Sequence, residues 1–350
     1  MNPFLKYGGI QLNDRFIAKG DLNSVLPKDE FEGKIINYCH ELFDESSEAV
    51  IQTSGSTGKK KNIIFQKSSL IQSAEATNSY FGLSSQTTAL LSLPMDYVAG
   101  KLMVVRAIVG EHNLIAKKPE SNPLKDLNQP IDFAPLTPHQ VQSILKDSPS
   151  RIDLIKTVLL GGLPVTKEIS RRIQDSGTVF YEGFGMAETL THIGVRKIID
   201  SEEAFFQPMK DVILAVDNRG CLIIDRPGIT QGKLVTNDLV SLEKNGFRWL
   251  GRIDNLINSG GIKIFPEEIE ELLNSQITSN FFVAGIPDQK FGQIVSLFIE
   301  GQEEFDLNKI EFESPYHKPK RVIHVKKFTY TESGKIKRQE TVARALSSAD

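Results

Sequence analysis

An alternation of apolar β-runs with amphipathic helical stretches, between about residues 30 and 200, constrains the fold of this chain most. The helical spacing occurs in SSLIQSAEATNSYFG and GKLMVVRAIVG, and the strand between them is TALLSLP. A further helix and strand follow in PHQVQSILKD and IKTVLLGG. Such alternation is typical of an α/β domain with a largely parallel sheet. We therefore expect an α/β fold.

The pattern changes twice towards the C-terminus. Short strands and turns follow residue 205, in VILAVDNRGCLIID, GKLVTNDLVSL and NGFRWLG, and predict an antiparallel subdomain. A small mixed α+β unit then begins at NLINSGGIKIFPEEIEELLNS, where Pro266 suits a helix start. We place a boundary near Arg252 to Asn255. The prediction is a large N-terminal domain, residues 1–252, with mostly parallel sheets flanked by helices, and a C-terminal domain, residues 253–350, joined by a hinge.

Composition and charge exclude several classes of partner. The chain has 350 residues of which 40% are apolar, enough for about two buried cores. Its 41 basic and 44 acidic residues nearly balance, which gives no footprint for nucleic acid or an anionic membrane. The opening MNPFLKYGGIQLNDRF lacks a leader pattern, and no apolar stretch approaches the roughly 18 residues of a membrane span. We expect no nucleic-acid partner, no membrane span and a cytoplasmic location.

The cysteines and histidines give no catalytic or metal signal. Cys39 and Cys221 lie far apart in apolar surroundings, so we expect buried reduced thiols instead of a disulfide. The six histidines have no ligand spacing, which leaves a structural zinc without support.

The loop TSGSTGKKKN, residues 53–62, has the composition of a polyphosphate site. Small residues let the backbone come close, hydroxyl and amide groups donate hydrogen bonds, and lysines supply positive charge. A solvated turn between strands has the same composition and stays open as an alternative. The flanking runs EAVIQT and NIIFQ predict two strands. The loop is therefore no ordinary P-loop, which needs a helix behind it and a glycine where Lys60 stands.

The stretch YEGFGMAETLTHIG follows the β-run GTVFY. Glycines beside Phe184 would let its ring stack on a flat partner, and Glu188 is a suitable ligand for the Mg²⁺ that accompanies nucleoside triphosphates. The alternative is a strand-to-helix turn in which Glu188 is a helix-start acid.

Two further stretches carry charged residues of interest. Asp238 and Arg252 could converge on a diol such as a ribose, although a surface ion pair would use the same residues. Near the C-terminus, TESGKIKR presents Lys335 after Gly334, and a solvated basic tail is the alternative.

Taken in order, these stretches resemble the motif series of the AMP-forming acyl-CoA synthetase family, over roughly residues 48–340. Within it they are most similar to the o-succinylbenzoate–CoA ligase branch of menaquinone biosynthesis. That similarity lies in LSLPMDYVAGKLMVVRAIVGE, APLTPHQVQSIL, VLLGGLPV and GMAETLTHIGVR.

The resemblance implies a role for each matched residue. ATP phosphates would contact Thr53, Ser54, Gly55, Ser56, Thr57, Gly58 and Lys61. The adenine would lie at Gly161, Gly162, Phe184 and Gly185, and the ribose at Asp238 and Arg252. Mg²⁺ would bind Glu188 with Thr57, Lys335 would reach the acyl carboxylate and α-phosphate, and Asp254 would be the hinge.

The implied reaction joins a carboxylic acid to coenzyme A through an acyl-adenylate, with ATP and Mg²⁺. The acid would be o-succinylbenzoate, whose second carboxylate needs a cationic partner. Substrate-binding candidates are Tyr97, Lys101, Arg106, Thr189 and Arg196. Several motif positions depart from the family: Lys60, Asn62, Tyr97, Ala187 and Thr329.

Three alternatives stay open. Another aromatic or short-chain acid, another thiol acceptor, or a non-catalytic nucleotide-binding homologue would fit the same motifs. The resemblance also suggests a homo-oligomer, which no apolar stripe in the sequence tests.

Overall fold

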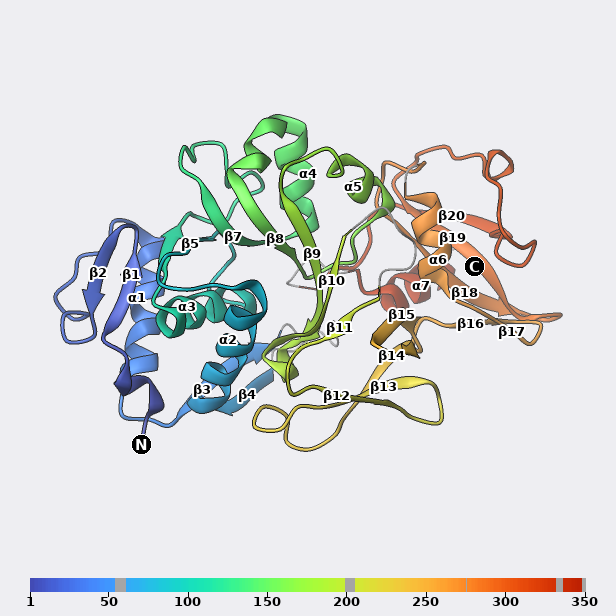
Figure 1. The fold of residues 1–350 in the computed structure, drawn as a ribbon. Helices are drawn as coiled ribbons and strands as arrows, with labels where there is room; N and C mark the ends of the chain where they lie inside the picture. The colour runs from blue at the N-terminus through green and yellow to red at the C-terminus, as the bar shows by residue number, and fades with distance from the viewer. Residues whose placement is uncertain (54–60, 199–204, 275, 332–335, 348–350) are drawn as a thin grey trace.

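A computed structural model describes residues 1–53, 61–198, 205–274, 276–331 and 336–347 (Figure 1). Its largest element is a nine-stranded sheet with the order β11-β10-β9-β8-β7-β5-β6-β1-β2. The strands are β1 (Gly9–Leu12), β2 (Arg15–Ala18), β5 (Thr88–Leu91), β6 (Asn113–Ala116), β7 (Ile131–Leu136), β8 (Ile155–Leu160), β9 (Val179–Met186), β10 (Thr191–Lys197) and β11 (Gln207–Pro208). In this order the strands from β9 to β1 are all parallel, whereas β10 and β11 at one edge and β2 at the other pair antiparallel. The predicted α/β fold with a largely parallel sheet is confirmed.

Helices cover both faces of this sheet. One core packs α1 (Glu30–Phe43), α2 (Lys67–Phe81) and α3 (Val98–Gly110) against strand residues such as Leu91, and the other packs α4 (Pro138–Asp147) and α5 (Lys167–Arg172) against residues such as Leu90. Adjacent strand residues point to opposite faces, so the continuous apolar runs of the sequence fill both cores. Short 3-10 helices lie at Pro3–Lys6, Pro149–Leu154, Ala187–Thr189 and Leu307–Lys309.

The helix boundaries follow local signals. Asp29 caps α1 by accepting a hydrogen bond from the Glu32 amide, and Gly82 ends α2 in the left-handed conformation. Thr137 and Gln140 form a reciprocal capping box at the start of α4. The carboxyl ends of the parallel strands lie at one edge of the sheet, and successive strands are added in opposite directions on the two sides of the β5–β7 pair. Ligands bind at such a switch point in open α/β sheets.

Strands β3 (Glu48–Thr53) and β4 (Lys61–Gln66) form a separate antiparallel pair, with Thr53 opposite Lys61. The prediction that the loop of residues 53–62 joins two strands is confirmed.

A second sheet, entirely antiparallel, follows the large one. It has the order β12 (Ile213–Val216), β13 (Cys221–Asp225), β14 (Leu234–Glu243) and β15 (Gly246–Arg252), as the sequence predicted. Its core contains Ile193, Leu222 and Phe247. Cys221 is buried and unpaired, like Cys39, which confirms the expectation of reduced buried thiols.

The C-terminal part contains a third sheet, built from β16 (Ile257–Ser259), β17 (Ile262–Ile264), β18 (Phe281–Asp288), β19 (Gly292–Glu300) and β20 (Arg321–Val325). Helices α6 (Pro266–Leu273) and α7 (Arg338–Ser347) pack against it, and two small cores of its own lie around Leu297 and Phe298. Pro266 begins α6, as predicted. The second sheet ends at Arg252 and the third begins at Ile257, so residues 253–256 connect them. The division into two domains stays a prediction.

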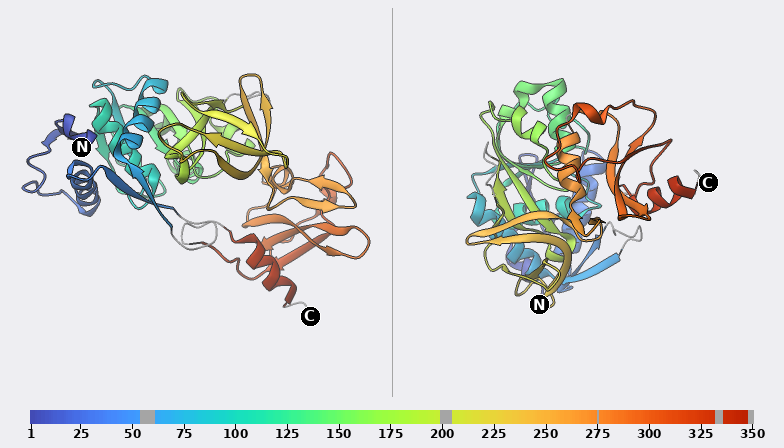
Figure 2. Two further views of the ribbon diagram at one scale, coloured as in Figure 1. Left: turned by 90° about the horizontal axis from the view of Figure 1, so that it is seen from below. Right: turned by 90° about the vertical axis from the view of Figure 1, so that its right-hand side faces the viewer.

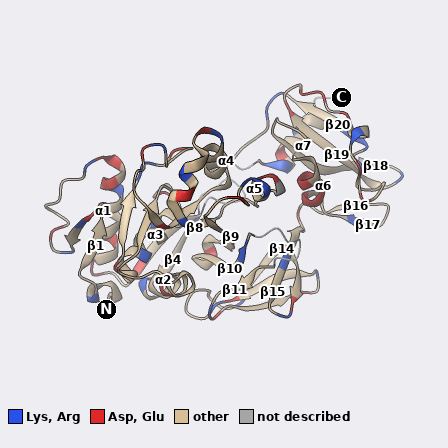
Figure 3. Ribbon diagram, turned by 45° about the horizontal axis from the view of Figure 1, so that its top comes forward, with Lys and Arg blue, Asp and Glu red and all other residues tan. Residues whose placement is uncertain are grey.

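The N-terminus and the C-terminal sheet lie on opposite sides of the molecule in Figure 1 and in the left view of Figure 2. Basic and acidic segments are interspersed along the ribbon, in keeping with their near balance (Figure 3). None of the helices in the described ranges has the length and apolarity to cross a membrane.

Candidate active site

Strand β9 carries the predicted aromatic and its glycines. Phe184 packs against Phe206 and Phe247, with ring centroids 5.6 and 5.1 Å apart. A side chain at Gly185 would overlap the carbonyl of Thr191 and the Cα of His192. Glycine is therefore required here for β9 to pair closely with β10.

Gly161 and Gly162 lie beside this strand. Leu160 pairs with Glu182, so the two glycines after Leu160 continue alongside the next residues of β9. A Cβ atom at either glycine would meet no atom within 4 Å, and Gly162 has φ +91°. A side chain at Gly161 or Gly162 would thus extend into open space.

Glu188 lies in the 3-10 turn that follows β9, and this turn contacts β3. Its side chain is exposed and has no hydrogen bond or ion pair to another described residue. An exposed carboxylate oxygen without a protein partner is a ligand that Mg²⁺ prefers. Strand β3, which leads into the 53–62 loop, therefore contacts the turn that carries a candidate metal ligand.

The same turn is held in a strained shape. Leu190 and Thr191 have φ +50° and +88°, a region that L-residues and above all β-branched ones avoid. Ser73 donates to the Leu190 carbonyl at 2.8 Å, and Thr189 donates to the carbonyls of Thr191 at 2.7 Å and Met186 at 3.1 Å. The hydroxyl of Thr189 is thus engaged within the turn. Strain of this kind persists where the surroundings enforce it and is frequent at functional sites.

Two buried arginines bind this turn from different elements. Arg106 of α3 donates to Thr191 Oγ1 at 3.2 Å, and Arg226, which follows β13, donates to the Thr189 carbonyl at 3.3 Å. They are 2% and 1% exposed, and the Nε atom of each has no hydrogen-bond partner. Neither forms an ion pair with a carboxylate in the described ranges. Burial lowers the pKa of Arg106 to about 9, with Arg226 adding to the effect, so both stay protonated at neutral pH.

Histidines beside these cations stay neutral. His192 contacts Thr77 Oγ1 at 3.3 Å and Thr191 Oγ1 at 3.2 Å. Burial, then Arg106 and Arg226, hold the pKa of His192 well below its usual value. The site therefore concentrates positive charge on the two guanidinium groups.

The other two cationic candidates already have protein partners. Lys101 lies over the Tyr38 ring at 4.8 Å and 3.9 Å from Glu41. Arg196 forms an ion pair with Glu182 at 2.6 Å and stacks on Phe206. Burial raises the pKa of Glu182, and Arg196 opposes this rise. Among the three candidates, Arg106 is the one without an acidic neighbour at ion-pair distance in the described ranges.

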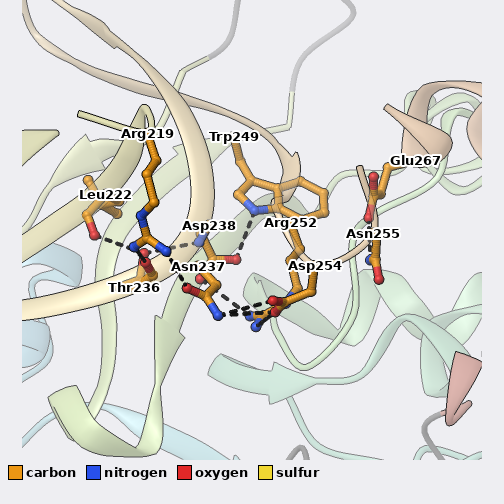
Figure 4. Close-up of polar contacts among 10 residues, drawn as sticks. All are labelled: Arg219, Leu222, Thr236, Asn237, Asp238, Trp249, Arg252, Asp254, Asn255 and Glu267. Atoms are coloured by element: carbon orange, nitrogen blue, oxygen red, sulfur yellow. Dashed lines mark hydrogen bonds and ion pairs between the residues drawn. The ribbon is translucent and has the colours of Figure 1, made fainter. Parts of the chain in front are cut away.

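Asp238 and Arg252 do converge, as predicted from their stretch (Figure 4). Arg252 Nη1 lies 3.6 Å from Asp238 Oδ2, and Trp249 Nε1 donates to Asp238 Oδ1 at 3.1 Å. Asp238 is 8% exposed; burial raises its pKa, and Arg252 followed by Trp249 opposes the rise. The carboxylate is thus held on both oxygens by residues of β15.

Asp254 is held from the N-terminal side. Arg252 donates to it at 2.8 Å, and Asn237 Nδ2 lies 3.2 Å from each of its carboxylate oxygens. On the other side, Asn255 Nδ2 donates to Glu267 Oε1 of α6 at 2.7 Å. The segment between the second and third sheets is therefore tied to both.

Part of the predicted site lies outside the described residues. Ser54, Gly55, Ser56, Thr57, Gly58 and Lys335 lie outside the described residues, as does the side chain of Thr53. Lys61 is exposed at the start of β4 and Tyr97 is the N-cap residue of α3. The sequence reasoning missed Arg226, Asn237 and Trp249, since no local pattern marks a buried unpaired cation or a cross-strand contact.

The chain matches the family model described as AMP-binding enzyme over residues 24–226. It is 26% identical to the 2-succinylbenzoate–CoA ligase of Listeria monocytogenes, over 94% of this chain and 80% of the relative. An acyl-CoA synthetase (AMP-forming)/AMP-acid ligase II-like protein from Dyadobacter fermentans is 31% identical, with TM-score 0.64, over 94% of this chain and 99% of the other. The Bacillus subtilis o-succinylbenzoate coenzyme A synthetase, solved with ATP and magnesium, shares the fold at 20% identity and TM-score 0.76, over 87% and 74%.

Proposed function

Because this chain belongs to the AMP-binding enzyme family, we propose that it is an AMP-forming ligase that joins o-succinylbenzoate to coenzyme A in menaquinone biosynthesis. The observation that carries the choice of a dicarboxylate is Arg106, a buried cation beside the Glu188 turn with no acidic neighbour at ion-pair distance in the described ranges. An unpaired buried charge is costly, and a carboxylate of the substrate would compensate it.

We propose that the nucleotide binds along β9, the second sheet and the 53–62 loop. The adenine would lie beside Phe184, where Gly161 and Gly162 leave open space, and the ribose would bind Asp238 and Arg252. The phosphates would reach the 53–62 loop, through residues 53–58 and Lys61. The Bacillus subtilis relative was solved with ATP and magnesium, which supports a nucleotide as the ligand.

Among the described residues, Glu188 fits the role of a magnesium ligand. Glu188 offers an exposed carboxylate, and Mg²⁺ is commonly held by one or two carboxylates together with substrate phosphates. Thr57 is the proposed second ligand. When bound, the ion would neutralise charge on the phosphates.

The reaction proceeds in two halves. The substrate carboxylate attacks the α-phosphorus of ATP, the bond to the β-phosphate oxygen breaks, and pyrophosphate leaves; Lys335 would stabilise the charge that develops on the α-phosphate. The thiolate of coenzyme A then attacks the acyl carbon, and AMP leaves with the electron pair of the broken bond. We propose that residues 1–252 and 253–350 act as two domains that move about Asp254 between the halves.

The test is an assay of thioester formation with a panel of acids, in which AMP and ADP are both measured. We expect thioester and AMP with o-succinylbenzoate, well above benzoate and fatty acids, and loss of activity in Glu188→Gln. Production of AMP with a different acid would retain the mechanism and reject the substrate. Absence of AMP with every acid, in a preparation that ATP still protects against thermal unfolding, would reject the ligase and indicate a nucleotide-binding homologue.

A further inference from the structure

The pairing of β14 with β15 contains an irregularity next to Asp238. Asp238 pairs with Arg252 and Leu239 with Gly251, but Val240 pairs with Trp249, so Leu250 has no opposite residue. In a regular strand Trp249 and Arg252, three residues apart, would point to opposite faces. The extra residue places both on the side of Asp238, which is how β-bulges re-aim side chains next to sites.

The bulge depends on a backbone conformation that favours glycine. Gly251 has φ +143°, and a Cβ atom there would lie 2.7 Å from Glu267 Oε2. A side chain at this position would be strained at this φ and would displace the Glu267 carboxylate. The arrangement of Trp249 around Asp238 is therefore specified by the local sequence.

Two donors face the Asp238 carboxylate, and a third hydrogen bond holds its backbone amide. Trp249 Nε1 holds Oδ1 at 3.1 Å, Arg252 lies 3.6 Å from Oδ2, and the Asp238 amide donates to Thr236 Oγ1 at 3.1 Å. The two oxygens of a carboxylate accept about four hydrogen bonds. With one firm donor on Oδ1 and a longer contact on Oδ2, both oxygens keep capacity for the two hydroxyls of a ribose.

The indole also contacts the aromatic cluster of the candidate adenine site. Trp249 packs against the core formed by Ile193, Phe206 and Phe247, against which Phe184 packs as well. The side chain of Trp249 thus shares a core with Phe184, proposed for the base, and donates to Asp238, proposed for the sugar.

We propose that Trp249 is a positioning residue of the nucleotide site, whose indole N–H orients Asp238 towards the ribose hydroxyls. The inference rests on the proposed function, in that Asp238 receives a nucleotide. It adds a residue that acts through Asp238 and is the only tryptophan of the chain.

The substitution Trp249→Phe keeps an aromatic ring and removes the donor. Binding of ATP and of 2′,3′-dideoxy-ATP is measured by calorimetry for both proteins. We expect the Kd for ATP to rise about ten-fold, the effect of one hydrogen bond to a charged group. The Kd for dideoxy-ATP should change less than two-fold, because this analogue has no hydroxyls for Asp238 to accept. Ser241→Ala, at an exposed position of the neighbouring strand β14, is the control and should leave both constants unchanged.

The dependence of ATP binding on pH distinguishes a Trp249 that orients Asp238 from one that only packs in the core. A donor to the charged form of a carboxylate lowers its pKa, so loss of the indole N–H should raise the pKa of Asp238 further. The pH below which ATP binding is lost should therefore shift upwards in Trp249→Phe. Equal changes for both nucleotides, no change for either, or an unshifted pH profile would overturn the proposal.

Folding of Trp249→Phe is checked by circular dichroism. If this variant does not fold, a second measurement on the wild-type protein tests the proposal. The tryptophan emission of the wild-type protein is then titrated with AMP, since the ribose would join the indole at the same carboxylate. A spectral change that saturates at the calorimetric Kd is expected, and constant emission at full occupancy would overturn the proposal. Failure of the wild type to bind ATP or AMP would instead reject the nucleotide site itself.

Discussion

Asn237 donates from its side-chain amide to both carboxylate oxygens of Asp254, at 3.2 Å each. Its own amide oxygen accepts from Arg219 at 3.3 Å, and its backbone carbonyl accepts from the Ile253 amide at 2.9 Å. One residue of β14 thus holds the first two residues of the connection between the second and third sheets.

Asn237→Ala should loosen that connection. A hydrogen bond of this kind contributes about 1 kcal/mol, so its loss should raise the population of locally opened states about five-fold. We expect amide hydrogen exchange within residues 253–256 to accelerate by that factor, as measured by mass spectrometry. Ser241→Ala is the control. Unchanged exchange in Asn237→Ala would show that the contact with Asp254 does not restrain the connection.

Arg106→Met should separate stability from substrate binding. Methionine fills a similar length without charge, and removal of an uncompensated buried charge is often neutral or stabilising. We expect an unchanged or higher Tm, together with a rise in KM for o-succinylbenzoate on the order of 100-fold. The exposed Lys146→Met is the matched control for loss of a positive charge. A normal KM in Arg106→Met would exclude this arginine from the acid site.

His112 should make stability depend on pH below 6.5. The ring is buried, neither nitrogen has a hydrogen-bond partner, and burial followed by Arg106 lowers its pKa to about 4. The unfolded chain binds a proton near pH 6.5. The neutral His112 ring therefore contributes fully to the free energy of unfolding above pH 6.5. About 3 kcal/mol of that free energy is lost as the pH falls towards 4. Denaturant unfolding at several pH values should show this decrease in the free energy of unfolding, and His112→Phe should reduce it. An equal dependence on pH in both proteins would contradict the role given to His112.

Two glycines should respond in opposite ways to alanine. Gly185→Ala forces a methyl group into the backbone of β10 and should cost about 3 kcal/mol of unfolding free energy. Gly161→Ala places the methyl group in open space, so the free energy should change by less than about 0.5 kcal/mol while the Kd for ATP rises. Thermal melting and calorimetry measure the two effects. If both variants lose stability equally, Gly161 does not border an open site.

Local patterns predicted most of the fold. Helices α2, α3 and α4 and strands β5 and β8 were predicted because their spacing and caps are encoded within each segment. Strands β1 and β2 were not predicted. The left-handed Asn13 and Asp14 between them are a typical hairpin turn and could have indicated the pair.

The site was predicted only where a motif carries the residue. Asp238 and Arg252 meet as their stretch implied, whereas Trp249 reaches Asp238 through a bulge that no spacing rule predicts. Arg196 forms an ion pair with Glu182, whereas Arg106 has no acidic neighbour at ion-pair distance in the described ranges. Both facts depend on how segments distant in sequence pack together. Residues whose partners depend on such packing are found only from the three-dimensional structure.

The position of β1 has a consequence for synthesis. Leu12 pairs with Leu114 of β6, so the strand next to the first hairpin leaves the ribosome about 100 residues later. At about 5–20 residues per second the nascent hairpin waits at least about 5 s, and an isolated two-stranded hairpin is only marginally stable in water. The newly made chain thus exposes an unpaired strand edge during translation, which makes a chaperone that covers extended segments most valuable before β6 emerges.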